Sequence, residues 1–363
     1  MYKVIVAALL SALCVSVPVT AVQAAEGVKK TAKKSVVKKA GVRRLAAAEP
    51  RDKIVRRVVT VRGKKKVVYQ RMTNVGFAPR PTMGDLAGLN LTRDPLDLKS
   101  NVALVVDQNN AEVLFEKNAN VALPIASITK MMTALVVVEA NQDLDEVLTV
   151  TEDDVDRAKF SSSRLNVGDQ LTRRNMLHIA LMSSENRAAS ALGRNYPGGL
   201  PAFVEAMNAK AQALGMTETH YADSTGLSTR NVASARDLAK LAMAAYEHPM
   251  LREFSTDPKA IVERNGRPVQ FGTTNGLVMP TSGWQIGLQK TGFINEAGRC
   301  MMMQAVVEGR AVIMVLLDAK GTAARVADAV RMKKWLAALK PASFSDTAGA
   351  AGAGAMTQSA AGM

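Results

Sequence analysis

The stretch PIASITKMMTALVVVEA, residues 124–140, is apolar on all sides when it is plotted as an α-helix. A helix without a polar face is usually buried inside a protein. Ser127 and Lys130 nevertheless fall in its first turn. Burying a lysine is costly unless the ammonium is paired or its pKa is lowered. We therefore expect a central, buried helix whose lysine has a chemical role.

The spacing of Ser127 and Lys130 allows the two side chains to react together. Residues three apart lie on the same face of a helix, so the amine can reach the hydroxyl. If burial lowers the lysine pKa, the neutral amine can take the serine proton and activate the oxygen as a nucleophile. The pattern S-x-x-K also arises by chance, as Ser35 and Lys38 show in a basic stretch that could not desolvate a lysine. Taken alone, it fits equally a lysine at a helix end that extends its charge to solvent.

Two further short motifs carry groups that suit the same chemistry. The residues SEN, 184–186, directly follow an apolar helical segment, where a loop could turn its side chains inward. The residues KTG, 290–292, lie in the strand-like run GWQIGLQKTGFINEAGRC. A lysine and a threonine can hold a carboxylate by charge and hydrogen bond, and a strand glycine lets another backbone come close. The three motifs together are far rarer than each one alone.

Hydrophobic periodicity predicts strands at both ends of a domain and helices between them. Two β-rich runs at residues 102–107 and 111–116 flank a Gln-Asn-Asn turn and predict a hairpin. Further strands are predicted at residues 299–309 and 310–321, and helices at residues 171–182, 200–215, 234–248 and 323–339. Ser234 is the expected N-cap of its helix. We therefore predict an α+β fold, with an antiparallel sheet of N- and C-terminal strands and a helical region inserted between them.

The three motifs, in this order, resemble the set S-x-x-K, S-x-N and K-T-G of β-lactamases and penicillin-binding proteins. The stretches PIASITKMMTALVV, SSENRAASALGRNYPGG and QKTGFINEAGRC are similar to those of the low-molecular-mass penicillin-binding proteins, the D-alanyl-D-alanine peptidases. Within that family, the last two stretches look most like the penicillin-binding protein 7 type, an endopeptidase. The resemblance covers about residues 86–339. It implies a β-lactamase/transpeptidase-like fold and a serine D,D-peptidase that cleaves D-Ala–diaminopimelate cross-links of peptidoglycan, is inhibited by β-lactams and uses no cofactor or metal.

The resemblance also implies a role for each motif residue. Ser127 would attack the D-alanine carbonyl and form an acyl-enzyme, Lys130 would be its general base, and Ser184 would relay the proton to the leaving amine. The backbone N–H groups of Ser127 and Phe293 would form the oxyanion hole. Asn186 would bind the substrate and also orient Lys130, and Lys290 would add positive potential and hold Ser184. Thr291 would bind the substrate carboxylate, and Gly292 would let the strand pair with the peptide. The side chain of Phe293, the last implied substrate-binding residue, would influence substrate preference.

Other enzyme classes share only part of this pattern. A D-alanyl-D-alanine carboxypeptidase that trims terminal D-Ala has the same motifs, but better-known carboxypeptidases carry a second β-rich domain and an amphipathic tail, which are not expected here. A β-lactamase needs a further carboxylate for deacylation, usually in an E-x-x-L-N pattern that this sequence lacks. The only histidines are His178, His220 and His248, and there is neither a G-x-S-x-G motif nor a metal-ligand spacing. A histidine triad and a zinc peptidase are therefore not expected, and His178 is interpreted as a packed core residue.

The two ends of the chain differ in composition from the domain. Residues 1–24 are typical of a signal peptide, with Lys3 at the start, an apolar run, and small residues for cleavage near Ala24. An uncleaved membrane anchor is the alternative interpretation of the same run. We expect export to the periplasm, after which Cys300 is the single cysteine. Residues 341–363 are rich in alanine and glycine and predict a disordered tail.

The positive charge is concentrated in one segment. The chain has a net charge of +15, and residues 26–80 contain 18 Lys/Arg but only 3 Asp/Glu. We predict that residues 25–85 are largely disordered, with a weak hairpin in RRVVTVRGKKKVVYQR, and that the catalytic domain spans residues 86–340. The segment is either a flexible spacer or an attachment to an anionic envelope surface. A nucleic-acid-binding protein is the alternative of a different class, but the export signal and the few aromatic residues argue against a nucleic-acid partner.

Overall fold

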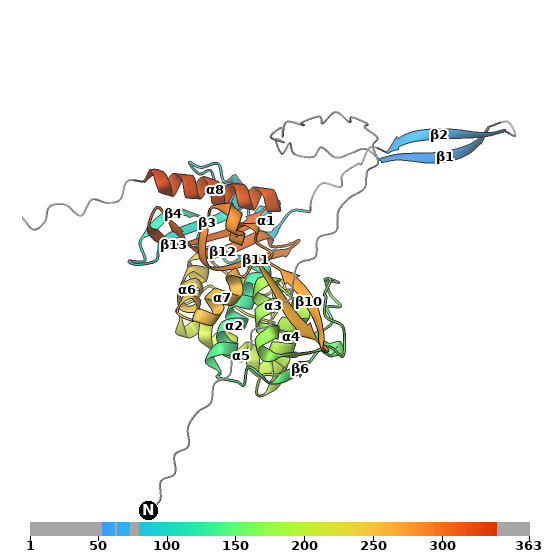
Figure 1. Ribbon diagram of the computed structural model, residues 1–363. Helices are drawn as coiled ribbons and strands as arrows, with labels where there is room; N and C mark the ends of the chain where they lie inside the picture. Colours follow the sequence, from blue (N-terminus) through green and yellow to red (C-terminus); the bar gives the residue numbers. More distant parts are fainter. Residues whose placement is uncertain (1–52, 62–63, 73–79, 340–363) are drawn as a thin grey trace, which may run out of the picture. The chain divides into compact units, whose positions relative to one another are not determined.

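The computed structural model describes residues 53–61, 64–72 and 80–339, which belong to two separate units (Figure 1). In the first unit, strands β1 (Lys53–Val61) and β2 (Lys64–Met72) pair in antiparallel fashion. They form the hairpin expected from the alternating pattern of residues 56–71. The proposed signal peptide, the first part of the basic segment and the C-terminal tail lie outside the described residues, so the statements about them stay predictions.

The second unit is built on one five-stranded antiparallel sheet in the order β11-β12-β13-β3-β4. Strands β3 (Ser100–Asp107) and β4 (Val113–Lys117) come from the start of the domain, and β11 (Gln285–Ile294), β12 (Gly298–Val307) and β13 (Arg310–Ala319) from its end. The pairing of β13 with β3, in which Val315 lies opposite Leu104, joins the two ends of the chain. The predicted α+β fold with a helical insertion is therefore confirmed.

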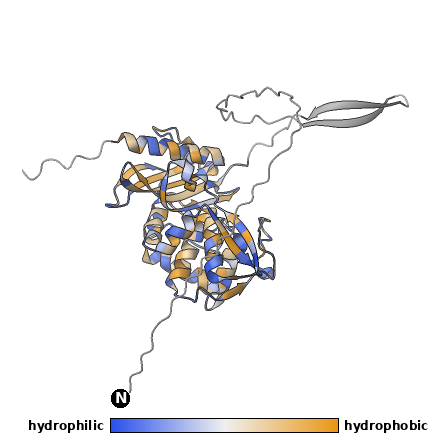
Figure 2. Ribbon diagram, in the orientation of Figure 1, coloured by the Kyte–Doolittle hydropathy of each residue, from blue (hydrophilic) through white to orange (hydrophobic). Residues whose placement is uncertain are grey.

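Both faces of this sheet are covered by helices (Figure 1). Along β3, Ala103 and Val105 pack with Met332 of helix α8 (Thr322–Ala338), whereas Leu104 belongs to the larger core shared with the inserted helices. Successive strand residues point to opposite faces, so a strand covered on both sides is apolar at every position. This explains the continuous apolar runs in the sequence, which give the sheet its orange stretches in Figure 2.

The inserted region holds helices and short strand pairs between β4 and β11. Its helices are α2 (Thr129–Glu139), α3 (Arg173–Met182), α4 (Asn186–Arg194), α5 (Gly199–Ala213), α6 (Ala235–Tyr246) and α7 (Pro249–Thr256). The short strands pair as β5 (Leu123–Pro124) with β8 (Val232–Ala233), β6 (Val147–Thr149) with β7 (Gln170–Thr172), and β9 (Lys259–Arg264) with β10 (Arg267–Gly272). Ser234 caps α6, since its hydroxyl accepts a hydrogen bond from the Asp237 N–H, which confirms the predicted cap.

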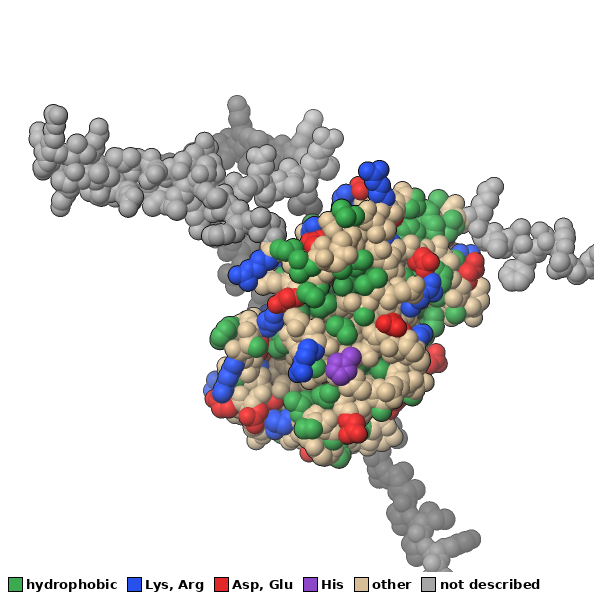
Figure 3. All heavy atoms as spheres, turned by 180° about the vertical axis from the view of Figure 1, so that it is seen from behind, with side chains coloured by type: hydrophobic (Ala, Val, Ile, Leu, Met, Phe, Trp, Pro, Cys, Tyr) green, Lys and Arg blue, Asp and Glu red, His purple; other side chains and the backbone are tan. Residues whose placement is uncertain are grey.

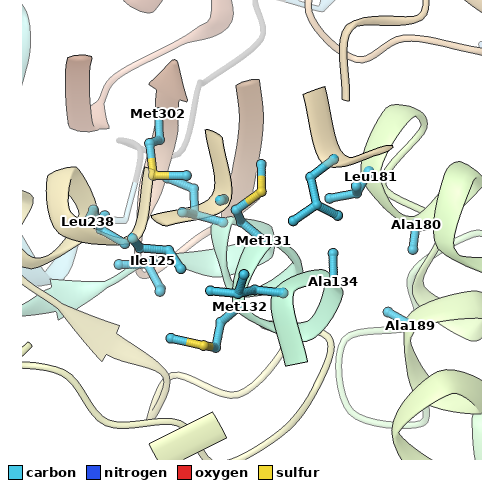
Figure 4. Packing of buried hydrophobic residues seen from close by; sticks show 14 of the residues in the cluster. Ile125, Met131, Met132, Ala134, Ala180, Leu181, Ala189, Leu238 and Met302 are labelled. Atoms are coloured by element: carbon cyan, nitrogen blue, oxygen red, sulfur yellow. The ribbon is translucent and has the colours of Figure 1, made fainter. Parts of the chain in front are cut away.

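Helix α2 lies at the centre of the main hydrophobic core. Its residues 129–137 are all buried. Figure 4 shows Met131 of α2 among Leu181 from α3, Leu238 from α6 and Met302 from β12. A helix enclosed in this way needs apolar side chains in every direction, which is the pattern that the sequence shows. The prediction of a central buried helix is confirmed.

Several local boundaries differ from those predicted. Ser127 lies in a 3₁₀ helix, Ala126–Ile128, that precedes α2 rather than in the first turn of the α-helix. Such turns are frequent at helix N-termini, and they also bring residues three apart onto one side. Residues before 86 also pack on the domain, because the hydroxyl of Thr82 donates to Asp318 Oδ2 at 2.7 Å and ties the short helix α1 (Met83–Leu86) to the sheet. Helices α4 and α7 and the β9–β10 hairpin were not anticipated from the sequence.

The surface of the domain carries charges of both signs. On the face shown in Figure 3, Lys and Arg side chains are interspersed with Asp and Glu. Residues 81–363 contain 28 Lys/Arg and 29 Asp/Glu, so the basic excess of the chain does not come from this part of the sequence. None of the helices in the described ranges is both long and apolar enough to cross a membrane.

The link between α8 and β3 gives a test of the fold. The carboxylate of Asp328, which is fully buried, accepts hydrogen bonds from the backbone N–H groups of Lys99 and Ser100 and from the Ser100 hydroxyl. Asp328→Ala leaves these donors unpaired, so we expect a loss of about 3 kcal/mol in the free energy of unfolding, measured by urea denaturation. Asp145→Ala removes a carboxylate that is 80% exposed and should leave the transition midpoint unchanged. Equal effects of the two substitutions would contradict this account.

Candidate active site

Ser127 is held in a strained backbone turn between β5 and α2. The preceding residue, Ala126, has a φ of +49°, a conformation that is unfavourable for a residue with a Cβ atom. Two glycines pack directly against this turn. A Cβ atom added to Gly226 would lie 2.0 Å from the Ala126 carbonyl oxygen, and one added to Gly292 would lie 3.0 Å from the Ser127 nitrogen. Two distant segments of the chain therefore fix the backbone of Ser127, and only glycine fits at these contacts.

The amine of Lys130 is surrounded by three oxygen atoms at a fully buried position. Its Nζ lies 2.9 Å from Ser127 Oγ, 2.6 Å from Asn186 Oδ1 and 2.6 Å from the Thr225 carbonyl oxygen. A neutral amine has two N–H donors and one lone pair. The amide and backbone oxygens can only accept, so they take the two N–H groups and leave the lone pair facing the Ser127 hydroxyl. This arrangement orients the amine to receive the proton of Ser127.

The electrostatic environment favours an uncharged amine near neutral pH. Burial lowers the pKa of Lys130 to about 7, although the negative charges of Asp223 and Glu185 act in the opposite direction. A base with a pKa near the working pH is largely available in its neutral form and is still strong enough to accept a proton. After proton transfer, the two carboxylates would stabilise the ammonium ion that forms.

The second motif turns sharply between α3 and α4. Ser184 adopts a φ of +62°, and Asn186 is the first residue of α4. The structure brings Asn186 to Lys130, and its Nδ2 donates to Ser161 Oγ at 2.8 Å. No hydrogen bond joins Ser184 to Lys130 or Lys290 within the described part of the chain. The expected hydrogen bond between Lys290 and Ser184 is therefore not present among the described residues.

The middle residue of the motif, Glu185, holds the neighbouring loop. Its carboxylate is 7% exposed and accepts hydrogen bonds from the Ser163 hydroxyl and, at 3.5 Å, from the backbone N–H of Arg164. The same loop carries Ser161, which contacts Asn186. Glu185 therefore ties the loop of residues 161–165 to the second motif, a role that the sequence analysis did not foresee.

The third motif lies on the edge strand β11. Lys290 is fully buried, and its Nζ donates to the Thr291 carbonyl at 2.9 Å. Burial, together with the charges of Lys130 and Arg325, holds the pKa of Lys290 well below its usual range. The Thr291 and Thr274 hydroxyl oxygens are 2.6 Å apart. Both amines are fully buried, and each disfavours the charge of the other.

The residue after the third motif has a different setting. Phe293 is 45% exposed, and the guanidinium carbon of Arg299 on β12 lies 3.7 Å from the centroid of its ring. The backbone nitrogen of Ser127 adjoins Gly292, the neighbour of Phe293. The close contact of β11 with the Ser127 turn therefore places the residue next to Phe293 against the backbone N–H of Ser127, the other group expected in the oxyanion hole.

Sequence reasoning missed the residues that shape the loop before α6. The carboxylate of Asp223 accepts hydrogen bonds from the backbone N–H groups of Thr225, Gly226 and Ser228. Asn231 is fully buried and donates to the Asp223 carbonyl at 3.0 Å. This network places the Thr225 carbonyl against Lys130 and Gly226 against the Ser127 turn. The sequence feature that could have revealed this network is the turn-rich run DSTGLSTRN, residues 223–231. This run lies within the residues covered by the resemblance, but the sequence analysis assigned it no role.

The remaining candidates lie apart from this cluster. His178 packs on Phe254, with ring centroids 4.4 Å apart, and its Nε2 is 2.9 Å from Asp257 Oδ2. Cys300 is buried as a free thiol, and burial raises its pKa to about 12. The described residues contain no group of three His, Cys, Asp or Glu side chains placed to hold a metal ion.

Comparison with known proteins agrees with this geometry. Residues 90–321 match peptidase family S11, described as D-alanyl-D-alanine carboxypeptidase. The chain belongs to this family of serine peptidases. A D-alanyl-D-alanine endopeptidase of Pseudomonas aeruginosa is 46% identical over 266 residues, which cover 73% of this chain and 83% of that protein. The D-alanyl-D-alanine endopeptidase of Escherichia coli is 40% identical over 267 residues, which cover 73% of this chain and 85% of the relative.

Solved structures of the family share the fold. The DD-transpeptidase of Streptomyces K15 superposes with a TM-score of 0.63 at 28% identity, covering 68% of this chain and 100% of that one. Penicillin-binding protein D2 of Listeria monocytogenes, in its ampicillin-bound form, gives a TM-score of 0.58 at 30% identity and covers 67% of this chain and 98% of the other. The prediction of a penicillin-binding protein of the D,D-peptidase family is confirmed.

The lowered pKa of Lys130 predicts the pH dependence of acylation. Only the neutral amine can accept a proton, so the rate of labelling by a fluorescent penicillin should rise with pH through about 7 and then level off. Lys130→Ala should lower that rate by about 10³-fold. Lys99→Ala, which changes a half-exposed lysine, should retain both the rate and the profile. A rate that is constant or falls over this pH range would exclude a neutral amine as the base.

The contact of Gly226 predicts a second effect on acylation. Gly226→Ala forces the Ala126 carbonyl away and displaces Ser127, and misplacing a reacting atom by about 1 Å can cost about 100-fold in rate. Gly266 also has a positive φ, but no atom lies within 4 Å of an added Cβ. Gly266→Ala therefore shares the backbone strain without the collision, and should leave the penicillin acylation rate unchanged. The explanation fails if both variants lose activity to the same extent.

Proposed function

We propose that this chain is a D-alanyl-D-alanine endopeptidase that cleaves D-Ala–diaminopimelate cross-links of peptidoglycan through an acyl-enzyme on Ser127. The observation that carries the proposal is the buried amine of Lys130, which lies 2.9 Å from Ser127 Oγ and whose other two contacts are to oxygen atoms that can only accept. This arrangement activates an alcohol for attack on a carbonyl without histidine or metal. The preference for cross-links is supported by the 46% and 40% identical relatives, both described as D-alanyl-D-alanine endopeptidases.

The proposed reaction has two steps. In acylation, Ser127 Oγ forms a bond to the D-alanine carbonyl carbon while its proton moves to Lys130, and the C–N bond breaks as the proton passes, through Ser184, to the leaving amine. In deacylation, water gives its proton to Lys130 and its hydroxyl to the carbonyl carbon, and Ser127 recovers its proton as it leaves. The backbone N–H groups of Ser127 and Phe293 stabilise the oxyanion in both steps.

The other motif residues position the substrate. Thr291 binds the carboxylate beside the scissile nitrogen. The negative charge of that carboxylate favours the protonated form of Lys290, whose pKa is lowered by burial in the free protein, and so lets Lys290 add positive potential behind it. Asn186 serves both partners, since its Oδ1 accepts from Lys130, and its Nδ2 has a second N–H, besides the one donated to Ser161 Oγ, for the substrate backbone. Gly292 lets β11 run close to Ser127, so the peptide can pair with this edge strand. A β-lactam would place its ring carbonyl at the same point and acylate Ser127, in line with the ampicillin-bound form of the Listeria relative.

Cell-wall cross-links lie outside the cytoplasm, which fits the signal peptide proposed for residues 1–24. The chain would act in the periplasm after cleavage near Ala24. The basic segment before the domain would then serve as a tether to an anionic envelope surface, since its charge is well suited to phosphate and carboxylate groups.

Digestion of purified sacculi tests the proposed function. The wild-type protein should convert cross-linked muropeptide dimers to monomers, measured by liquid chromatography, whereas Ser127→Ala should leave the dimers intact and fail to bind fluorescent penicillin. Both proteins should show the same urea denaturation curve, because Ser127 is not part of the hydrophobic core. Trimming of pentapeptides to tetrapeptides without loss of dimers would identify a carboxypeptidase instead.

A further inference from the structure

A cavity adjoins the proposed catalytic cluster next to Thr291. It has a volume of about 330 Å³, and its wall includes Thr274, whose hydroxyl oxygen is 2.6 Å from that of Thr291. Thr291 is proposed to hold the carboxylate next to the scissile nitrogen. The cavity therefore adjoins the group proposed to hold the carboxylate of the leaving strand. Its volume falls within the range of small-ligand pockets.

One cationic side chain, Arg164, lines this cavity. Its guanidinium carbon lies 5.7 Å from the centroid of the Phe271 ring, and its Nη1 donates to the Gln270 carbonyl. A guanidinium group has five N–H donors arranged in a plane that matches a carboxylate. The contacts to β10 use one nitrogen and one face, so further donors remain for a ligand.

The loop that carries Arg164 is fixed from two sides. Its carbonyl oxygen accepts a hydrogen bond from Arg264 Nη1 at 2.6 Å. On the other side, Glu185 of the second motif accepts from Ser163 and from the Arg164 N–H. Glu185 is the only acidic residue that lines the cavity, and its carboxylate is already hydrogen-bonded to the loop. The cation is tied to the motif that carries Ser184 and Asn186, and so keeps its place relative to the reacting groups.

We propose that this cavity is the subsite for the leaving strand, and that Arg164 binds a second carboxylate of the leaving stem peptide. This inference rests on the proposed function. Removal of a terminal D-alanine releases one carboxylate, which Thr291 already holds. Cleavage of a cross-link releases a whole stem peptide, which carries further carboxylates beyond the one at the scissile nitrogen. Arg164 therefore favours cross-linked substrates over pentapeptides.

The test compares two substrates, a purified cross-linked muropeptide dimer and a pentapeptide monomer. Arg164→Met keeps the length of the side chain but removes its charge, so the ratio of kcat/KM for the dimer to that for the pentapeptide should fall about tenfold, through a higher KM for the dimer. Arg164→Lys should lose less, because it keeps the charge without the planar donors. Arg267→Met, which removes an exposed arginine of β10 that does not line the cavity, should leave the ratio unchanged. Fluorescent penicillin counts the competent sites in each preparation.

A second comparison, with a chemically modified dimer, tests whether Arg164 binds a carboxylate of the leaving stem. A dimer in which the leaving-stem carboxylates other than the one beside the scissile nitrogen are converted to amides should be cleaved equally well by the wild type and by Arg164→Met, because the two changes remove the same interaction. An unchanged ratio in Arg164→Met, or an equal fall for both substrates, overturns the inference while the proposed function stands. A wild-type protein that trims pentapeptides but leaves dimers intact overturns the proposed function itself.

Discussion

The contact between the buried amine of Lys130 and the hydroxyl of Ser127 is the constraint on which the rest of the domain depends. An amine can act as a base only if it is uncharged, and here burial supplies that condition by lowering its pKa to about 7. Burial in turn requires that α2 be enclosed on all sides, between the sheet and the other inserted helices. The hydrophobic core around Met131 is therefore needed for the chemistry, because it keeps Lys130 buried, as well as for the stability of the domain.

Three segments from different parts of the sequence complete this contact. Asn186 and the Thr225 carbonyl take the two N–H groups of the amine, and Gly292 on β11 packs on the backbone beside Ser127. The backbone is strained at two points, Ala126 and Ser184, which both have positive φ values. Strain of this kind persists only where the surrounding structure holds it, and here the hydrogen bonds of Asp223 and Asn231 make the neighbouring loop rigid. The site is therefore preorganised before any substrate binds.

The sheet supports this arrangement because it is covered on both faces. Strand β11 brings Lys290 and Thr291 to the site, and its neighbours in the sheet are fixed by α8 on one side and by the inserted helices on the other. An edge strand held in this way offers one free edge for an extended peptide. The loop of residues 161–165 and Thr274 line one cavity, and the link of the loop to Glu185 couples that cavity to the second motif.

The sequence by itself determined the class of fold, the buried helix and the three motifs. These depend on local signals. Alternating or continuous apolar runs predict strands, an apolar helix without a polar face predicts a buried helix, and the three short motifs rarely occur together in this order. Ser127 and Lys130 could be paired because residues three apart must lie on one side of a helical turn. Gly292 of the third motif was also identified from the sequence. Its predicted role was to let the strand pair with the peptide, whereas the structure shows that it packs against the backbone of Ser127.

Only the tertiary structure decided which distant groups meet. The orientation of the Lys130 lone pair depends on an oxygen of Asn186 and a carbonyl of Thr225, and no local pattern records that these converge on one atom. The roles of Gly226, Asp223 and Glu185 follow from contacts across long stretches of sequence. The structure also directs the Lys290 amine to the Thr291 carbonyl, whereas the resemblance had implied a hydrogen bond to Ser184. Hydrogen bonds and close contacts depend on differences of less than an ångström, and these are set by the packing of the whole domain.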